Sequence, residues 1–354
     1  MTHAAPGEDW HRRRERGSLW AMHLVAWLYR IVGHHLAAPL VDPIVAYFFL
    51  TDGAGRRASR AYLERLFATP GGAWRLGRAP RLSDSFRHYL EFGRTVMERM
   101  GIWLGRGDGF SVEVEGWENL ENLIRDGRGG LILGAHVGSF DAMRLLARKS
   151  SPRAVKILMH TAHAARIGEI FRRLGEISGT PSEMGVIPVR AGSFEHVLEV
   201  KQCIARGEVV AILADRMHPL ERGGRVPVTF LGHTAYLPES PMRLAAVLGC
   251  PVVLMAGLRV APRRYVVVVE PLAERLVLPR GSAAELRRAC QRYADWLARL
   301  CERAPLQWFN FFDFWAGPPD LEPTGTGATP PREPRSTGAR PSAGPPREAR
   351  TESA

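Results

Sequence analysis

From about residue 110, the sequence alternates short apolar runs with longer stretches in which apolar residues recur at helical spacing. Such alternation is typical of α/β proteins, because each helix returns the chain to begin another strand in the same direction. We predict an α/β fold with a central, mostly parallel sheet flanked by helices and preceded by a helical membrane-associating region. The expected strands are Phe110–Val114, Gly130–Gly134, Ala154–Met159, Val209–Ala214, Val226–Leu231, Val252–Leu258 and Tyr265–Glu270, and helices are expected at 117–126, 139–149, 163–174, 194–206, 238–248 and 282–302.

An apolar segment from Leu19 to Leu50 precedes this region, and Pro39 and Pro43 interrupt it before it reaches membrane-spanning length. Arginines flank both of its ends, which disfavours a single pass across a membrane. We predict a re-entrant or interfacial helical hairpin with both flanks in the cytoplasm. The alternative is a buried helical pair in a soluble core. On the membrane, four aromatic residues would lie at headgroup depth, namely Trp20, Trp27, Tyr29 and Tyr47.

Two amphipathic helices are expected after this segment, at 56–68 and 82–100. The last residues are rich in Pro, Gly and Arg and lack large apolar side chains, which indicates disorder. The predicted organisation is a polar leader at 1–18, a helical membrane-associating region at 19–109, an α/β domain at 110–316 and a disordered tail at 317–354.

The chain has a net charge of +12, and the excess is densest in residues 51–110, which hold eleven arginines and six acidic residues. An anionic membrane or an acidic partner protein fits this charge. A nucleic acid is not expected, because the sequence has no stripe of arginines interleaved with aromatic residues. The four cysteines are scattered, without a CxxC pair or a histidine at zinc-ligand spacing, so we predict free thiols and no metal site.

The most informative segment for chemistry is the apolar run GGLILGAH, which leads into VGSFD and a helical stretch. Ligands of α/β sheets bind beyond the carboxyl ends of strands, where His136 is expected. His136 could take a proton from a hydroxyl group, and Asp141 could accept from its other ring nitrogen. Backbone N–H groups of Gly138 and Ser139 could bind an oxyanion at the start of the next helix.

Two other interpretations of this segment remain open. His136 could be a structural histidine, since the same spacing of a histidine and an acidic residue recurs by chance at His3 and Glu8. The segment GAHVG also has the shape of a nucleophile elbow with histidine at the serine position. Ser139 would then be the nucleophile of a serine hydrolase, although it stands at the wrong place in that pattern.

Further candidates follow two other expected strands. Asp215 and Arg216 would face the same sheet edge as His136, where Arg216 could hold a phosphate; a structural Asp–Arg pair is the alternative. Arg190 follows a possible short strand and has a similar structural alternative. The closing segment WFNFFDFW at 308–315 could line an acyl groove, dock on the membrane or close the core.

The segment GAHVGSFD resembles the H-x4-D/E motif of the lysophospholipid acyltransferase superfamily, and most of all its bacterial lipid A late acyltransferases. The apolar leader ending in VAYFFL, the stretch RRASRAYLERLF and the block from Gly207 to Leu254 are similar to conserved regions of that branch, in the same order. The resemblance covers roughly residues 20–315. It implies that His136 is the general base and Asp141 its orienting acid. The pair Asp215–Arg216 and the ending Leu237–Pro238–Glu239 depart from the lipid A enzymes, which indicates a different acceptor.

We therefore predict a membrane-associated O- (or N-) acyltransferase on the cytoplasmic face of a bacterial inner membrane. It would move a fatty acyl group from acyl carrier protein or coenzyme A to a lipid or glycolipid acceptor by direct attack, with no cofactor besides the thioester. The predicted catalytic residues are His136 and Asp141. The predicted substrate-binding residues are Gly138, Ser139, Arg190, Asp215 and Arg216. The alternative function is that of a catalytically silent protein that binds lipid or scaffolds a partner at the membrane surface.

Overall fold

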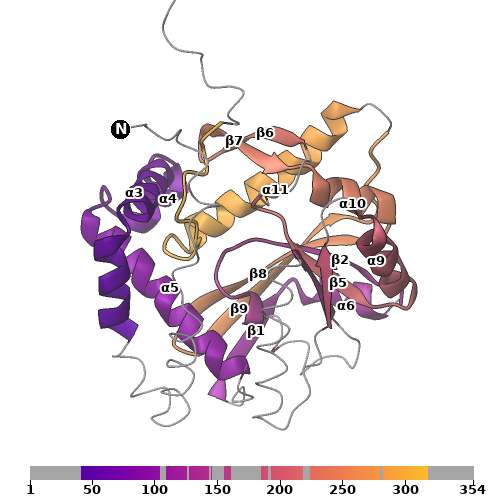
Figure 1. The fold of residues 1–354 in the computed structure, drawn as a ribbon, viewed down its shortest axis with the longest axis horizontal. Coiled ribbons are helices and arrows are strands. Elements are labelled where there is room, and N and C mark those ends of the chain that lie inside the picture. Colours follow the sequence, from indigo (N-terminus) through magenta and orange to yellow (C-terminus); the bar gives the residue numbers. More distant parts are fainter. Residues whose placement is uncertain are drawn as a thin grey trace, which may run out of the picture. The chain divides into compact units, whose positions relative to one another are not determined.

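The computed structural model describes residues 41–103, 109–125, 127–142, 145, 155–160, 185–189, 193–217, 224–279 and 282–317. A seven-stranded sheet with the order β1-β9-β8-β2-β5-β3-β4 forms its centre (Figure 1). The strands are β1 (Ser111–Glu115), β2 (Gly130–Gly134), β3 (Val155–His160), β4 (Gly185–Val189), β5 (Val209–Leu213), β8 (Val252–Ala261) and β9 (Arg264–Ala273).

Strands β8, β2, β5, β3 and β4 run parallel to one another, and β1 runs parallel to β9. Among the described pairings of this sheet, only that of β8 with β9 is antiparallel. The predicted α/β class with a mostly parallel sheet is confirmed. β2, in the middle of the sheet, is buried along its whole length. This is why its sequence is a continuous apolar run without alternation.

One predicted strand lies outside the central sheet. Residues Arg225–Phe230 form β6, which pairs antiparallel with β7 (His233–Pro238) in a separate two-stranded hairpin. Exposed and buried residues alternate along β6, as in a strand with one face in solvent. This alternation distinguishes β6 from the fully buried strand β2 at the centre of the sheet. β4 is the possible short strand expected before Arg190, and β7 was not among the predicted strands.

In Figure 1, α3, α4 and α5 lie to the left of the sheet, and α9 and α10 lie to its right. The helices are α3 (Gly53–Phe67), α4 (Pro70–Leu76), α5 (Leu82–Trp103), α6 (Trp117–Arg125), α9 (Glu195–Ala205), α10 (Ser240–Leu248) and α11 (Ala283–Arg303). α4 was not predicted, although its boundaries follow known capping rules. The side chain of Thr69 accepts from Gly72 N–H, Pro70 begins the helix and Gly77 ends it in the left-handed conformation.

The long amphipathic helix α11 joins the β6–β7 hairpin to the central sheet. The side-chain amide of Gln291 donates to Thr229 O and accepts from Thr229 N–H, both at 2.8 Å. Deeper in the core, the hydroxyl of Tyr293 donates to Gly134 O at 2.8 Å, at the last residue of β2. α11 therefore fixes the carboxyl end of the central strand.

A helical segment at residues 41–51 packs Val41, Val45 and Phe49 against α5. Its opposite face is also apolar, with Tyr47 63% and Leu50 72% exposed. Within the described residues, no helix combines the length and the apolar character needed to cross a membrane. Residues 1–40, with most of the predicted hairpin, lie outside the described residues, so a membrane-associating helical region is not confirmed.

α5 is attached to the sheet by a buried ionic cluster. The fully buried carboxylate of Glu98 accepts from Arg259 Nε at 3.0 Å and from the Tyr265 hydroxyl at 2.5 Å. Arg259 also reaches Glu91 at 3.1 Å. A buried carboxylate is tolerated only with such partners, so this cluster fixes how α5 lies against β8 and β9.

His88 joins the helical region to the chain's closing segment. Its Nε2 donates to Trp308 O at 2.9 Å, which leaves Nδ1 to accept from the Ser59 hydroxyl at 3.0 Å. The imidazole is fully buried, and burial lowers the pKa of His88 from 6.5 to about 4. The folded protein therefore holds this imidazole neutral.

Acidification from pH 6.5 to pH 4 is expected to destabilise the fold through His88. In this range His88 is protonated in the unfolded chain and neutral in the folded chain. The free energy of unfolding therefore falls as pH falls, by up to about 3 kcal/mol. Chemical denaturation of the wild type and of His88→Gln, which cannot titrate, checks this. The wild type should lose more stability than the variant over this range. Equal slopes for the two proteins would contradict the assignment.

Candidate active site

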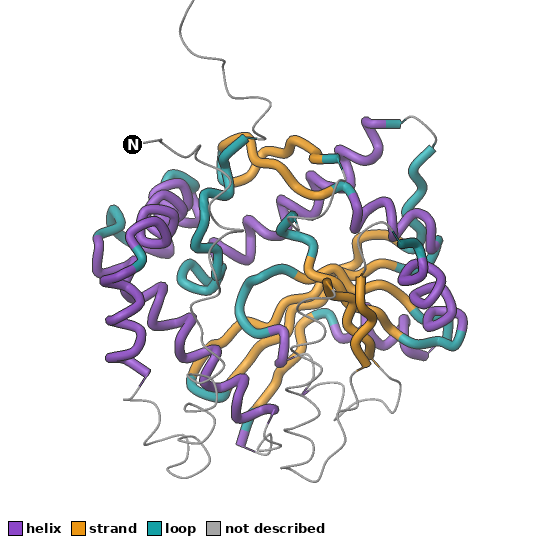
Figure 2. The backbone as a smooth tube through the Cα atoms, viewed as in Figure 1, coloured by secondary structure: helices purple, strands orange, loops and turns teal. Residues whose placement is uncertain are grey.

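The register of the sheet brings His136 and Asp215 together. β2 and β5 pair in parallel with Gly134 opposite Leu213, so the second residue beyond each strand end is His136 on one side and Asp215 on the other. The carboxylate accepts from His136 Nδ1 at 2.7 Å and from the backbone N–H of the same residue at 3.1 Å. The loop that carries His136 follows β2 and is drawn in teal in Figure 2.

Asp215 is a buried carboxylate that the surrounding donors keep ionised. It is 1% exposed, and its Oδ2 also accepts from the indole Nε1 of Trp308 at 3.2 Å. Burial opposes ionisation, but the charge and hydrogen bonds of His136 and the cation of Arg216 outweigh it. They hold the pKa of Asp215 well below its ordinary value.

The same arrangement defines the state of His136. Because the Asp215 carboxylate can only accept, Nδ1 carries the proton and Nε2 has the lone pair. Burial and the nearby cation of Arg216 lower the pKa of His136, more than Asp215 raises it. The imidazole side chain is still 32% exposed. His136 is therefore a neutral base at neutral pH, oriented through Nδ1 and accessible from outside.

Arg216 lies beside this pair. Its guanidinium donates to Phe309 O and lies over the ring of Phe312, with 5.4 Å from Cζ to the ring centroid. Its buried Nε has no hydrogen-bond partner among the described residues. We predicted Asp215 and Arg216 at the same sheet edge as His136, and the structure brings the three residues together there.

Asp141 does not accept from His136, so the predicted His136–Asp141 hydrogen bond is wrong. Its carboxylate accepts from Trp103 Nε1 at 2.6 Å and forms an ion pair with Arg99 Nε at 2.6 Å. Both partners come from the last two turns of α5. Asp141 is buried and thus joins the start of the helix after His136 to the helical region. The physical reason for the error is that the turn after β2 directs the two side chains to different neighbours.

The backbone N–H groups of Gly138 and Ser139 are already bonded, which corrects their predicted role at an oxyanion. Gly138 N–H donates to Gln307 O at 2.8 Å and Ser139 N–H donates to Gly257 O at 2.7 Å. Gly138 has φ +63°, and a Cβ there would come within 2.1 Å of Gly257 O. The glycine is therefore required by close approach of a neighbouring strand.

Ser139 is fully buried, and its Oγ has no hydrogen-bond partner in the described part of the chain. A serine nucleophile needs an accessible oxygen and an adjacent base. The described surroundings of Ser139 supply neither, which argues against the serine-hydrolase interpretation.

The closing segment 308–315 mainly closes the core. Trp308 is fully buried, with edge-to-face contacts to Tyr62, Phe230 and Phe314 at centroid distances of 4.9–5.1 Å. Phe309 N–H donates to His136 O at 2.9 Å, so the segment also holds the backbone of the site. Arg190 lies outside the described residues. Within the described ranges, no three side chains come together that could hold a metal ion.

The family model for bacterial lipid A biosynthesis acyltransferases matches residues 6–316. The chain belongs to this family. It is therefore an acyltransferase, and the match spans the helical region, the sheet and the closing segment together. No curated protein sequence matches the chain.

The sequence did not identify two features of this acyltransferase's site. Asp215 was expected to bind substrate, whereas the structure makes it the partner of the imidazole; the parallel strand ends were the signal that could have revealed this. Trp308, the third donor to Asp215, lies 93 residues further along the chain. Nothing in its local sequence indicates that contact.

The two aspartates are expected to respond differently to amidation. Asp215→Asn should lower kcat at least about a hundredfold, because an amide no longer enforces the Nε2 base or stabilises its protonated form. Asp141→Asn should mainly lower the free energy of unfolding, by about 1–3 kcal/mol, because it breaks a buried ion pair. Transfer kinetics and thermal unfolding of both variants check this. An Asp141→Asn variant of wild-type stability that is as inactive as Asp215→Asn would overturn it.

Proposed function

We propose that this acyltransferase moves a fatty acyl group from an acyl thioester to a hydroxyl or amine of a lipid or glycolipid acceptor, with His136 as general base. The observation that carries the proposal is the accessible, neutral His136, whose Nδ1 is bonded to the buried Asp215 carboxylate at the carboxyl ends of β2 and β5. The ends of parallel strands are where α/β sheets bind their ligands.

In the proposed reaction, Nε2 of His136 accepts the proton of the acceptor as its oxygen or nitrogen attacks the thioester carbonyl carbon. The imidazolium that forms is stabilised by the Asp215 carboxylate, to which Nδ1–H donates. The tetrahedral intermediate then expels the thiolate, which takes the proton from Nε2. The products are the acylated lipid and the free thiol, and the base is regenerated without a covalent enzyme intermediate.

Arg216 is the residue we propose for the negative charge of the intermediate. The described structure offers no such role to Gly138 and Ser139, whose N–H groups are bonded elsewhere. Arg216 is a permanent cation close enough to His136 to lower its pKa, and its Nε has no partner in the described part of the chain. A cation at this place would stabilise an oxyanion or a phosphate of the donor.

The outer face of the helical segment 41–51 supports a membrane-bound enzyme. Ile44, Tyr47 and Leu50 recur every third residue on that face, and all are exposed. A helix that is apolar on both faces needs a second apolar neighbour, which lipid would supply. The arginines of α3 follow directly, and their charge suits anionic lipid or an acidic acyl carrier protein. We place the enzyme on the cytoplasmic face of the inner membrane.

The test of this proposal is product analysis on membranes that contain the protein, supplied in parallel with acyl carrier protein and coenzyme A carrying a labelled acyl chain. Lipid mass spectrometry should find an acylated lipid with the wild type that is absent, or reduced at least about a hundredfold, with His136→Ala. The same comparison identifies the acceptor and the donor.

The control is His233→Ala, which replaces an exposed histidine on the β6–β7 hairpin and should leave transfer unchanged. Both variants should stay in the membrane fraction. If folded wild type yields no product that depends on His136 from either donor, a silent lipid-binding or scaffold protein becomes the better explanation. Release of free fatty acid instead of an acylated lipid would indicate a hydrolase.

The pH dependence of kcat/KM should report the neutral base. Because burial and the Arg216 cation lower the pKa of His136 from 6.5, activity should rise with pH along a limb whose apparent pKa lies below 6.5, and then stay level through neutral pH. Arg216→Gln removes that cation and should move the limb to higher pH, while lowering the rate. A limb that does not move in Arg216→Gln would contradict the electrostatic assignment.

A further inference from the structure

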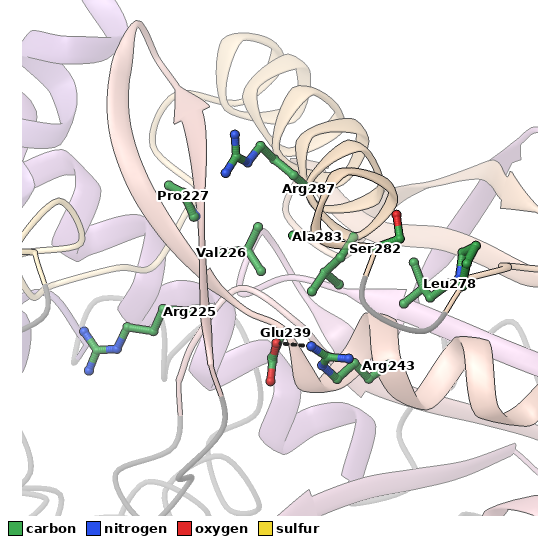
Figure 3. Close-up of a pocket in the computed structure, with 11 residues that line it drawn as sticks. Arg225, Val226, Pro227, Glu239, Arg243, Leu278, Ser282, Ala283 and Arg287 are labelled. Carbon is green, nitrogen blue, oxygen red and sulfur yellow. Dashed lines mark ion pairs between the residues drawn. The ribbon is translucent and has the colours of Figure 1, made fainter.

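A concave site lies where the start of β6, α10 and the start of α11 meet. It is a cavity of about 440 Å³, and Figure 3 shows the residues that line it. Neither His136 nor Asp215 or Arg216 is among them. Its size is in the range of pockets that hold small molecules, and the residues of its walls determine which chemistry it recognises.

Arginines from all three elements line this cavity: Arg225 from β6, Arg243 from α10 and Arg287 from α11. One acidic residue, Glu239, accompanies them and forms an ion pair with Arg243 at 2.8 Å. Arg225 and Arg287 have no ion pair within the part of the chain that the structure describes. Among the described residues, these two exposed cations of the lining are therefore available to an anion.

Figure 3 shows how these groups are arranged. Arg243 is turned to Glu239, while Arg287 reaches from α11 toward β6, and Arg225 is turned outward at the start of that strand. All three arginines are exposed, so their long side chains can change rotamer to meet a ligand. Glu239 also accepts from Gly224 N–H at 3.0 Å, which keeps its carboxylate at the base of the hairpin.

Apart from Ser282, the N-cap of α11, the rest of the lining is apolar. It includes the buried Val226 and Leu286, with Leu278 and Pro279 from the connection before α11. A bare phosphate ion would fill only part of a cavity of this size and would leave the apolar wall without a contact. The ligand that fits both the arginines and the apolar residues of the lining therefore has a doubly charged phosphate and an apolar part next to it.

We propose that this cavity is a binding site for an organic phosphate monoester, held by Arg287 and by rotation of the exposed Arg225 and Arg243 side chains toward it. Guanidinium groups suit phosphate because they bind its oxygens through two parallel N–H groups. The neighbouring apolar wall selects a phosphate that bears a hydrocarbon group. The site is separate from the transfer reaction and does not depend on the proposed function.

The test uses the full-length chain in detergent and phosphate-free buffer, without acyl donor or acceptor. Calorimetric titration with n-butyl phosphate should give saturable binding at one site, at least fivefold tighter than inorganic phosphate. Arg287→Gln should weaken butyl phosphate at least tenfold, whereas Arg288→Gln, the next residue on α11 and outside the cavity, should not change it.

A second pair of variants tests the cavity without removing an arginine. Ala283→Glu places a carboxylate at the lining, in the first turn of α11 where an acidic residue favours the helix, and should abolish binding while the thermal midpoint is kept. Ala284→Glu puts the same charge on the adjacent exposed position outside the lining and should bind like the wild type. The proposal is overturned by no saturable binding, by equal affinity for inorganic phosphate, or by equal losses in the two members of either pair.

Discussion

The buried carboxylate of Asp215 is the constraint on which the rest of the site depends. A charge removed from water must be matched by donors close at hand, and here they come from His136 and Trp308. One donor belongs to the central strand's exit and the other to the closing segment. At the carboxyl end of β5, Asp215 therefore contacts two regions that are far apart in sequence. The same carboxylate fixes the tautomer of the His136 imidazole.

The helical region is part of this arrangement. His88 on α5 bonds the carbonyl of Trp308, and Asp141 is bonded to Arg99 and Trp103 at the end of the same helix. A change in how α5 lies on the sheet would therefore move both the residue that supports Asp215 and the helix start after His136. This coupling is a physical reason why the region that would face lipid and the region that would carry out transfer are found in one compact unit.

The sequence predicted the fold class because the apolar runs and helical repeats of an α/β protein are local patterns, visible within ten to twenty residues. It placed His136 and Asp215 at one sheet edge for the same reason. The partner of the imidazole was missed because strand order decides it, and β2 pairs with β5 across an intervening stretch of chain. Asp141, only five residues away, was the more obvious partner in sequence. The contacts of Gly138 with Gly257 and of Asp215 with Trp308 join distant segments that no local pattern connects.

The position of Trp308 in the chain also sets the order in which the site can be completed during synthesis. His136 and Asp215 leave the ribosome well before the indole that caps their hydrogen-bond pair, and the compact unit ends only nine residues after it, at Gly317. Because domains form as the chain emerges, the earlier strands can assemble while the carboxylate still lacks its third donor. The site is completed only when nearly all of the folded unit has been made.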